Sequence, residues 1–386
     1  MKVLHIITGL GIGGAEQQLR LLLRQLPTDS AVITLTNPGA VAEGIVADGV
    51  PVTDLDMAGN RDLGALPRLA RLIKRGRYDL VHTHLYRACL YGRFAARLAG
   101  VRSIVATEHS LGAVQIEGRP LSTGARALYL AGERLGTATV AVSATVARRL
   151  ERWGVPPERI HVVPNGIEVG RFAYDATARG AARTRLGVPQ EAFVVGGVGR
   201  LSGGKRFDRL VRAVAELPDA RLLLIGEGPE RDRLLRLARE RGAADRVLLP
   251  GACQDPPPPR AAHPSQQGPD LPSLLAAMDV FVSTSPDEAF GLAVVEGLAA
   301  GLPVLHVTCP ALQDLPADAA PGARRVSGSV PGLVDELRRF EKAGPHRLPV
   351  PPAARHYDIA RSAQQLMTVY DNAVRDPAPL REVSCS

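Results

Sequence analysis

The sequence predicts an α/β protein made of two doubly wound domains. Short apolar, β-rich runs alternate with segments of helical periodicity along most of the chain, which is typical of βαβ units and parallel sheets. A length of 386 residues exceeds one ordinary core, and the alternation restarts after the turn Pro164–Gly166. We therefore expect one domain over residues 1–166, a second over 167–354, and a final helix with a tail over 355–386.

The first domain is predicted from six apolar runs separated by amphipathic segments. The N-terminal run is too short for a signal peptide and enters a glycine loop at once, so we interpret it as a first buried strand. The expected strands are Val3–Thr8, Ala31–Thr36, Asp79–His82, Ser103–Thr107, Thr139–Ser143 and Ile160–Val163. The expected helices are Ala15–Leu26, Gly64–Arg75, Ala88–Ala99 and Ala144–Trp153.

The second domain is predicted from five further runs and a last helix at about Arg355–Ala373. A proline-rich segment over residues 255–270 is nearly free of apolar side chains and cannot join a core. We interpret it as an insertion into a short loop, with a role in binding a partner as the alternative. The expected strands are Phe193–Val198, Arg221–Ile225, Arg246–Leu249, Val280–Ser283 and Pro303–Val307.

The composition fits a globular protein of a reducing compartment. Hydrophobic residues make up 45% and charged residues 22%, and no apolar run is long enough for a membrane-spanning helix. The four cysteines are scattered without a C-x-x-C pair, which argues against a zinc site or a disulfide framework. We therefore expect a cytoplasmic location.

The positive charge is concentrated in the first half of the chain. Residues 1–165 hold 20 Lys plus Arg and 13 Asp plus Glu, whereas the whole chain has a net charge of +8. A basic half can attract anionic lipid headgroups at the inner face of a membrane, or a phosphorylated acceptor. Ordinary solvated arginines are the alternative, and nucleic acid is not expected because aromatics make up only 4%. The basic residues that cluster are Arg68, Arg71, Lys74, Arg75 and Arg77, followed by Arg87, Arg93, Arg97 and Arg102.

Two carboxylates, Glu288 and Glu296, have seven residues between them. Glu288 lies in a turn-rich loop after an apolar run, and Glu296 is predicted to lie about two turns into a helix. Such groups flank a crevice at the carboxyl end of a strand, where open α/β sheets bind ligands. The backbone amides of Phe290, Gly291 and Leu292 are predicted to form an anion site there. Two solvated glutamates on a surface helix are the alternative.

A glycine loop joins the first strand to the first helix. Gly9, Gly11 and Gly14 satisfy G-x-G-x-x-G, but a dinucleotide site also requires an acidic residue at the end of the second strand. That strand ends at Thr36–Pro38, which contains no acid, so NAD binding is disfavoured. The loop is instead predicted to bring backbone amides near a diphosphate or a sugar, with a purely structural turn as the alternative.

Further glycine loops follow the strands of the second domain. In the first of them Arg200 and Lys205 lie five residues apart, and together they can bind a diphosphate through a rigid fork and a point charge. The alternative is a solvated basic loop. Gly226 is expected to allow a sharp turn after the second strand, and Gly251 lies in the loop after the third.

Three histidines lie near strand ends of the first domain. His109 can hydrogen-bond a sugar hydroxyl or serve as a structural histidine. His82 and His84 form a His-x-His pair that suggests a metal, but the sequence shows no third ligand. We therefore expect no metal, and a role for this pair in orienting an acceptor.

These motifs together resemble retaining glycosyltransferases of family 4, which have the GT-B fold of two Rossmann-like domains facing a central cleft. The match includes the E-x7-E motif, a G-G-[AV]-E loop, a G-R-L-x-x-x-K segment and a P-N-G-[IV]-[DE] boundary. The match extends from the N-terminus to about Val307 and includes the last helix. The resemblance implies that this helix packs back on the first domain. Residues 308–326 depart from it, because the P-E-[IV]-[IV] segment and the T-G-x-[LV] strand of relatives are absent.

The resemblance implies a hexosyltransferase that moves a sugar from a nucleotide diphosphate, UDP rather than GDP, to a hydroxyl acceptor. The expected acceptor is a lipid-linked or cell-surface glycan intermediate, and no metal is required. The alternatives are a small natural-product aglycone, a sugar-nucleotide epimerase or phosphorylase, and a non-catalytic binding protein. The implied catalytic residues are Glu288, His109, Arg200 and Lys205. The implied donor-binding residues are Gly13, Gly14, Glu16, Phe290, Gly291, Leu292, Glu296, Gly226 and Gly251.

Overall fold

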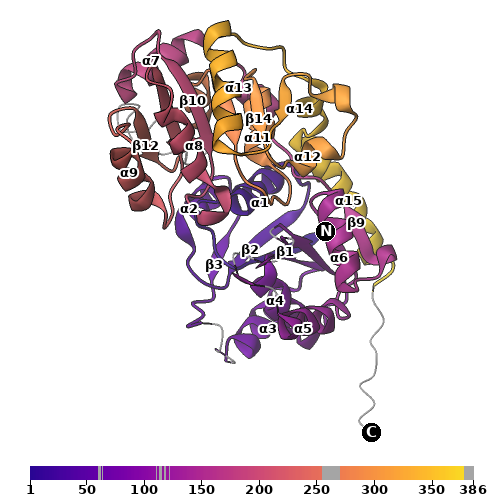
Figure 1. The fold of residues 1–386 in the computed structure, drawn as a ribbon. Coiled ribbons are helices and arrows are strands. Elements are labelled where there is room, and N and C mark those ends of the chain that lie inside the picture. The colour runs from indigo at the N-terminus through magenta and orange to yellow at the C-terminus, as the bar shows by residue number, and fades with distance from the viewer. Residues whose placement is uncertain are drawn as a thin grey trace. The chain divides into compact units, whose positions relative to one another are not determined.

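The computed structural model describes residues 1–59, 62, 64–109, 111–112, 115–116, 119–120, 122–253 and 270–377. The proline-rich segment, apart from Asp270, therefore lies outside the described residues. The chain forms two compact units (Figure 1). Unit 1 comprises Met1–Gly166 with Ile359–Ser386, and unit 2 comprises Ile167–Asp358.

Unit 1 is built on a seven-stranded parallel sheet in the order β3-β2-β1-β4-β5-β8-β9. Its strands are β1 (Lys2–Ile7), β2 (Asp29–Thr34), β3 (Val52–Asp54), β4 (Leu80–His84), β5 (Ile104–Glu108), β8 (Ala138–Ala141) and β9 (Ile160–Val162), with a separate pair β6 (Gln115–Ile116) and β7 (Arg119–Pro120). Its helices are α1 (Gly14–Gln25), α2 (Gly39–Ala47), α3 (Ala65–Gly76), α4 (Tyr86–Leu98), α5 (Thr123–Glu133), α6 (Ala144–Trp153) and α15 (Ile359–Arg375).

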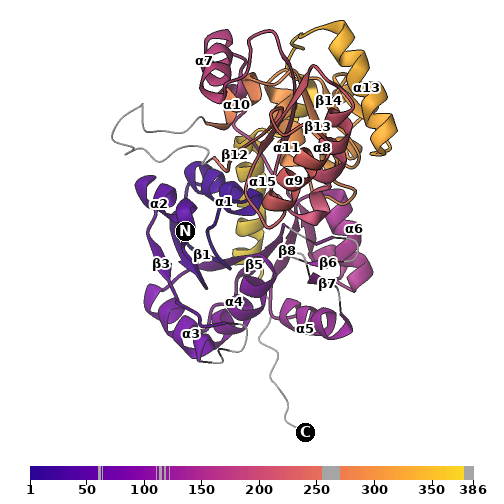
Figure 2. The same ribbon diagram turned by 60° about the vertical axis from the view of Figure 1, so that its left-hand side comes forward.

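Alternate strand residues of unit 1 face different helices. Val3 and Leu80 pack with α1 and α15, whereas Leu4 and Val81 pack with α3 and α4. Figures 1 and 2 show α1 and α2 on one side of this sheet and α3 and α4 on the other. The last helix thus completes the core of unit 1, because Tyr370 of α15 is fully buried against that face of the sheet.

Unit 2 has a six-stranded parallel sheet in the order β12-β11-β10-β13-β14-β15. Its strands are β10 (Phe193–Val198), β11 (Ala220–Ile225), β12 (Val247–Gly251), β13 (Val280–Ser283), β14 (Val304–His306) and β15 (Ala323–Arg325). Its helices are α7 (Ala176–Leu186), α8 (Phe207–Ala215), α9 (Arg231–Glu240), α10 (Leu271–Ala276), α11 (Leu292–Ala299), α12 (Pro310–Gln313), α13 (Val330–Ala343) and α14 (Pro352–His356).

The order of strands in unit 2 places four loops at one edge of the sheet. Strands β12, β11, β10 and β13 are parallel neighbours, so their carboxyl ends share that edge. The core beneath is formed by α8, α9 and α13, with Leu210, Leu234 and Leu333 buried against the sheet. The glycine loops and the E-x7-E loop all follow these four strands.

Candidate active site

The glycine loops of unit 2 interlock. Gly199 follows β10 and Gly226 follows β11, and Gly199 N donates a hydrogen bond of 3.0 Å to the carbonyl oxygen of Ile225. Gly226 N donates in turn to the carbonyl oxygen of Gly251 at 2.9 Å. Gly226 has φ of +144°, and a β-carbon there would collide with the carbonyl oxygen of Gly199. Only glycine fits this close approach, as the sequence predicts for a sharp turn.

An ion pair joins the basic loop to the E-x7-E loop. Lys205 Nζ lies 2.6 Å from Glu288 Oε1, and the two side chains are 30% and 14% exposed. The hydroxyl of Thr284, just after β13, donates to the carbonyl oxygen of Lys205 at 2.7 Å and fixes one loop against the other. Arg200, from the same basic loop, is exposed. Of the two predicted phosphate ligands, Lys205 therefore contacts a carboxylate and Arg200 lies at the surface.

The helix that carries Glu296 begins at a glycine N-cap. Gly291 is its N-cap with φ of +105°, and a β-carbon there would lie 2.6 Å from Cys309 Sγ. Helix α11 starts only at Leu292, so Glu296 is its fifth residue and lies little more than one turn along it. The prediction that Glu296 lies about two turns into the helix was wrong, because Gly291 adopts a left-handed conformation and stays outside the helix. The half-buried Glu296 is thus nearer to the helix N-terminus than expected.

The atypical segment after residue 307 forms the support behind this terminus. Ala311 N in α12 donates to the carbonyl oxygen of Phe290 at 3.0 Å, and the Tyr357 hydroxyl donates to the carbonyl oxygen of Ala311 at 2.6 Å. The rings of Phe290 and Tyr357 meet edge to face with centroids 4.9 Å apart. Burial raises the pKa of the Cys309 thiol to about 12, so Cys309 is a neutral packing group. The departure from the family pattern therefore changes the wall of the site, while Phe290 and Gly291 keep their support.

The glycine loop of unit 1 has a different design. Gly13 is the N-cap of α1, and a β-carbon on it would collide with the Glu16 carboxylate, which folds back over the helix start. A negative charge in the first turn stabilises a helix N-terminus. A β-carbon on Gly11 would meet nothing within 4 Å. Gly14 is exposed as the first residue of the helix.

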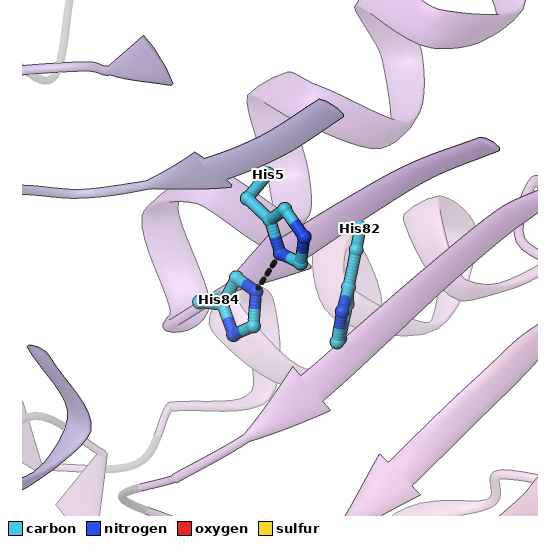
Figure 3. A group of neighbouring side chains, drawn as sticks. All are labelled: His5, His82 and His84. Atoms are coloured by element: carbon cyan, nitrogen blue, oxygen red, sulfur yellow. Dashed lines mark hydrogen bonds between the residues drawn. The ribbon is translucent and has the colours of Figure 1, made fainter. Parts of the chain in front are cut away.

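Three buried histidines and the half-buried His109 form a polar cluster in unit 1 (Figure 3 shows the three buried ones). His5 Nδ1 lies 3.2 Å from His84 Nε2, and His84 Nδ1 lies 3.2 Å from His109 Nε2. His82 contacts two hydroxyls instead, Tyr370 at 2.6 Å through Nδ1 and Thr107 at 2.7 Å through Nε2. The sequence pointed to His82, His84 and His109 but missed His5. The parallel register that pairs His5 with His82 brings it there.

The cluster contains the third imidazole that the sequence did not reveal. One ring nitrogen from each of His5, His82 and His84 lies within 4.8 Å of the others, so these residues could hold a metal ion. Both ring nitrogens of His82 are hydrogen-bonded to hydroxyl groups, so an ion bound through His82 would have to displace one of these contacts. Burial lowers the pKa of His5 to about 3 and that of His109 to about 4, so both are neutral at pH 7.

His109 is the member of the cluster that lines a small pocket of unit 1. The pocket has a volume of about 10 Å³, close to the space that one water molecule needs. Its polar lining is formed by residues from α1, β5, the domain-ending turn and α15: Gln18, Thr107, His109, Asn165 and Ser362. Gln18 also accepts a hydrogen bond of 3.0 Å from Gly166 N, which ties α1 to the end of the first domain. The pocket is thus lined both by His109 and by residues of the predicted domain boundary, Pro164 and Asn165.

Two family models match the chain in succession. Residues 12–171 match Glycosyltransferase Family 4, and residues 179–356 match Glycosyl transferases group 1. A D-inositol 3-phosphate glycosyltransferase 1 of Catenulispora acidiphila is 32% identical over 361 residues, which cover 85% of this chain and 82% of that protein. The chain belongs to glycosyltransferase family 4. It is therefore a hexosyltransferase that uses a nucleotide sugar.

Further relatives fix the fold class. A UDP-Gal:alpha-D-GlcNAc-diphosphoundecaprenol alpha-1,3-galactosyltransferase of Escherichia coli is 28% identical over 254 residues, covering 64% of this chain and 62% of that enzyme. The solved structure of Anabaena Alr3699/HepE in complex with UDP-glucose matches with a TM-score of 0.79 at 21% identity, over 96% of this chain and 100% of that one. The predicted GT-B fold of this family 4 enzyme is thereby confirmed.

The basic surface of this glycosyltransferase is smaller than the sequence suggested. Arg71, Lys74, Arg75 and Arg77 are exposed on and just after α3, but Arg93 is fully buried over the Tyr129 ring. Arg93 therefore adds nothing to the exposed positive charge, because it lies on the inner face of α4. Within the described part of the chain, no helix combines the length and the hydropathy needed to cross a bilayer.

Proposed function

We propose that this enzyme transfers a sugar from a UDP-sugar to a hydroxyl acceptor with retention of anomeric configuration and without a metal. The observation that supports this best is the contact between Lys205 and Glu288 beside the N-terminus of α11. A cation, a carboxylate and helix amides at one sheet edge suit a sugar diphosphate. The HepE structures that contain UDP and UDP-glucose favour UDP as the nucleotide.

The reaction passes through a sugar with oxocarbenium character. The bond from sugar C1 to the diphosphate breaks, the acceptor oxygen bonds C1 on the same face, and the acceptor proton passes to the departing phosphate oxygen. Arg200, Lys205 and the amides at Phe290–Leu292 stabilise the negative charge that develops on the diphosphate. No side chain acts as a nucleophile.

Glu288, Glu296 and His109 position the donor in this proposal. Carboxylates accept two hydrogen bonds each, so Glu288 holds hydroxyls of the donor sugar and Glu296 those of the nucleotide ribose. The Lys205 contact orients Glu288 before the donor arrives. His109 contacts the sugar from unit 1, and Gly13, Gly14 and Glu16 bring the start of α1 to the diphosphate.

The donor is tested by thermal shifts of the purified protein with UDP, GDP, ADP and their common sugar conjugates, each with EDTA and with Mg²⁺. We expect stabilisation by UDP and UDP-sugars that EDTA does not remove. A shift with GDP alone would change the assigned base. A shift that requires Mg²⁺ would contradict the metal-independent site, and no shift with any nucleotide would contradict the donor assignment.

The acceptor is proposed to carry a phosphate or diphosphate and to be a lipid-linked or cell-surface glycan intermediate. The names of two relatives specify phosphorylated acceptors, inositol 3-phosphate and GlcNAc-diphosphoundecaprenol. Each compound is incubated with the UDP-sugar that stabilises the protein most, and the product anomer is determined by NMR. Product with a neutral aglycone alone would contradict the proposal. Nucleotide release without an acceptor would indicate an epimerase or a hydrolytic side reaction.

Peripheral membrane contact is proposed for the exposed cations of α3. Arg71, Lys74 and Arg75 lie within five residues and are exposed, and each such residue near an anionic surface contributes about 1 kcal/mol. We expect salt-sensitive co-sedimentation with vesicles of phosphatidylglycerol, lost in the triple Glu variant of these positions. The matched control reverses Arg236 and Arg239, exposed on α9. An equal loss in the control, or no binding at low salt, would contradict a site on α3.

A further inference from the structure

The histidine cluster of unit 1 contains a continuous chain of three imidazoles. His5, His84 and His109 come from β1, the end of β4 and the residue after β5, three neighbouring strands. The two N···N separations are both 3.2 Å; His5 and His84 are fully buried, and His109 is half-buried. His82 lies beside His84 with ring centroids 4.0 Å apart and the ring planes tilted by 41°, but it hydrogen-bonds elsewhere. The chain thus ends at His109, the histidine on the pocket wall.

A chain of neutral imidazoles has only two arrangements of its protons. Each neutral ring carries one N–H and one lone pair, so each hydrogen bond must run in the same direction as the next. In one arrangement His5 Nδ1–H donates to His84, His84 Nδ1–H donates to His109 Nε2, and His109 keeps its proton on Nδ1. In the other, all directions reverse and His5 is left with a proton on Nε2.

The two ends of the chain decide between these arrangements. Among the described residues, neither His5 Nε2 nor His109 Nδ1 has a hydrogen-bond partner. A buried N–H without an acceptor is rarer and more costly than a buried acceptor with a free lone pair. The arrangement that leaves only a lone pair at His5, deep in the core, places the unsatisfied N–H on the buried Nδ1 of His109, a half-buried residue that lines the pocket.

We propose that His5 and His84 are positioning residues that fix His109 in the tautomer with its proton on Nδ1, and so make it a hydrogen-bond donor to the ligand. The effect on catalysis depends on the proposed function, in which His109 contacts the donor sugar, whereas the tautomer itself does not. A ligand hydroxyl or phosphate oxygen would accept this hydrogen bond. A lone pair at the same position would instead require a donor from the ligand.

The tautomer is tested directly by long-range ¹H–¹⁵N NMR on the full chain with ¹⁵N-labelled histidine, assigned through single His→Gln variants. We expect His109 to show a protonated Nδ1 and an unprotonated Nε2 between pH 6 and 8. His84→Leu removes the hydrogen bond to Nε2 and should release this preference. His84→Asn should restore it, because its amide nitrogen stands where His84 Nδ1 stands. A His109 protonated on Nε2, or unchanged in His84→Leu, would overturn the proposal.

The consequence for binding is tested by calorimetry with UDP and UDP-glucose. We expect His84→Leu to weaken UDP-glucose about ten- to a hundredfold, the usual effect of losing a group that orients a functional imidazole, while UDP affinity stays unchanged. His84→Asn should recover most of the loss, and His161→Gln, on the edge strand β9, is the matched control. An equal loss for both ligands would indicate a merely structural role and overturn the positioning claim.

Two further results distinguish this proposal from the donor assignment and from a metal site. If the wild-type protein binds neither ligand but shows the expected His109 tautomer, the donor assignment fails and the imidazole chain stands. Stoichiometric binding of Zn²⁺ or Ni²⁺ that is lost in His5→Asn would assign the imidazoles to a metal ion and overturn the chain. We expect no such binding because His82 already uses both ring nitrogens.

Discussion

Units 1 and 2 both gather polar side chains at the carboxyl ends of parallel strands, but with opposite electrostatics. Unit 1 uses buried, neutral imidazoles, whose charged forms are disfavoured by burial. Unit 2 uses a charged pair, Lys205 and Glu288, which keeps access to solvent. An unpaired ion inside a protein is strongly destabilising. We therefore expect the removal of a charge at this site to matter more in unit 2 than in unit 1.

The largest expected effect is the loss of transfer when Glu288 loses its charge. Glu288→Gln keeps the shape but removes an ionic acceptor and the partner of Lys205, so we expect turnover to fall on the order of 10²–10³-fold. The measurement is sugar transfer with the donor that stabilises the protein. Glu240→Gln, exposed at the end of α9, is the matched control. Near-normal transfer by Glu288→Gln with an intact fold would contradict the prediction that the reaction depends on the charge of Glu288 in unit 2.

The second prediction concerns the stability of unit 1 at acidic pH. The pKa of His5 is about 3 and that of His109 about 4 in the folded protein, both below the ordinary value of 6.5. Between pH 6.5 and about 4 the unfolded chain binds more protons than the folded unit, so the stability of unit 1 must fall as the pH falls. The slope approaches about 1.4 kcal/mol per pH unit for each such group. Among the described residues of unit 2, the comparable group is His306, with a pKa of about 4.

Hydrogen exchange measured across this pH range separates the two units. We expect amides of β1 and β4 to lose protection at a higher pH than those of β10 and β13. His5→Asn should shift the loss in unit 1 to lower pH without changing unit 2. If β10 and β13 open first, or if His5→Asn has no effect, the neutral histidines do not limit the acid stability of unit 1.

The sequence predicted the central strands because their signal is local. A buried parallel strand reads as a short apolar run, and β10 and β13 begin and end where expected. The sequence missed β3 and β15, since these three-residue strands at sheet edges have mostly exposed side chains that match no buried pattern. The helices α2 and α5 of unit 1 were also missed.

The site was predicted where its residues lie close in sequence, and missed where they meet through pairing of distant strands. The E-x7-E segment is continuous, but the Lys205–Glu288 contact joins residues 83 positions apart. His5 enters the cluster only through the register of β1 with β4, which no spacing reveals. The burial of Arg93 could not be predicted from the sequence either, because its partners Tyr129 and Thr139 lie on other elements.

A third prediction compares the glycine loops of the two units. Gly226→Ala forces a β-carbon into a left-handed backbone against Gly199, whereas Gly11→Ala meets open space. We expect Gly226→Ala to lower the free energy of unfolding by about 1–3 kcal/mol and Gly11→Ala to leave it within about 0.5 kcal/mol. Urea denaturation measures both. Equal effects would mean that the loops of units 1 and 2 are equally constrained, contrary to the structure.

The smallest expected effect tests what Glu16 does. Its carboxylate folds over Gly13 at the N-terminus of α1, which is a stabilising position for a negative charge. Glu16→Gln keeps the shape and removes the charge, so we expect a loss of about 0.3–1 kcal/mol in stability. Transfer should change less than tenfold if the negative charge of Glu16 serves only the helix. A much larger loss of transfer at unchanged stability would show that this charge acts on the donor, and unit 1 would then share with unit 2 the use of a charged carboxylate.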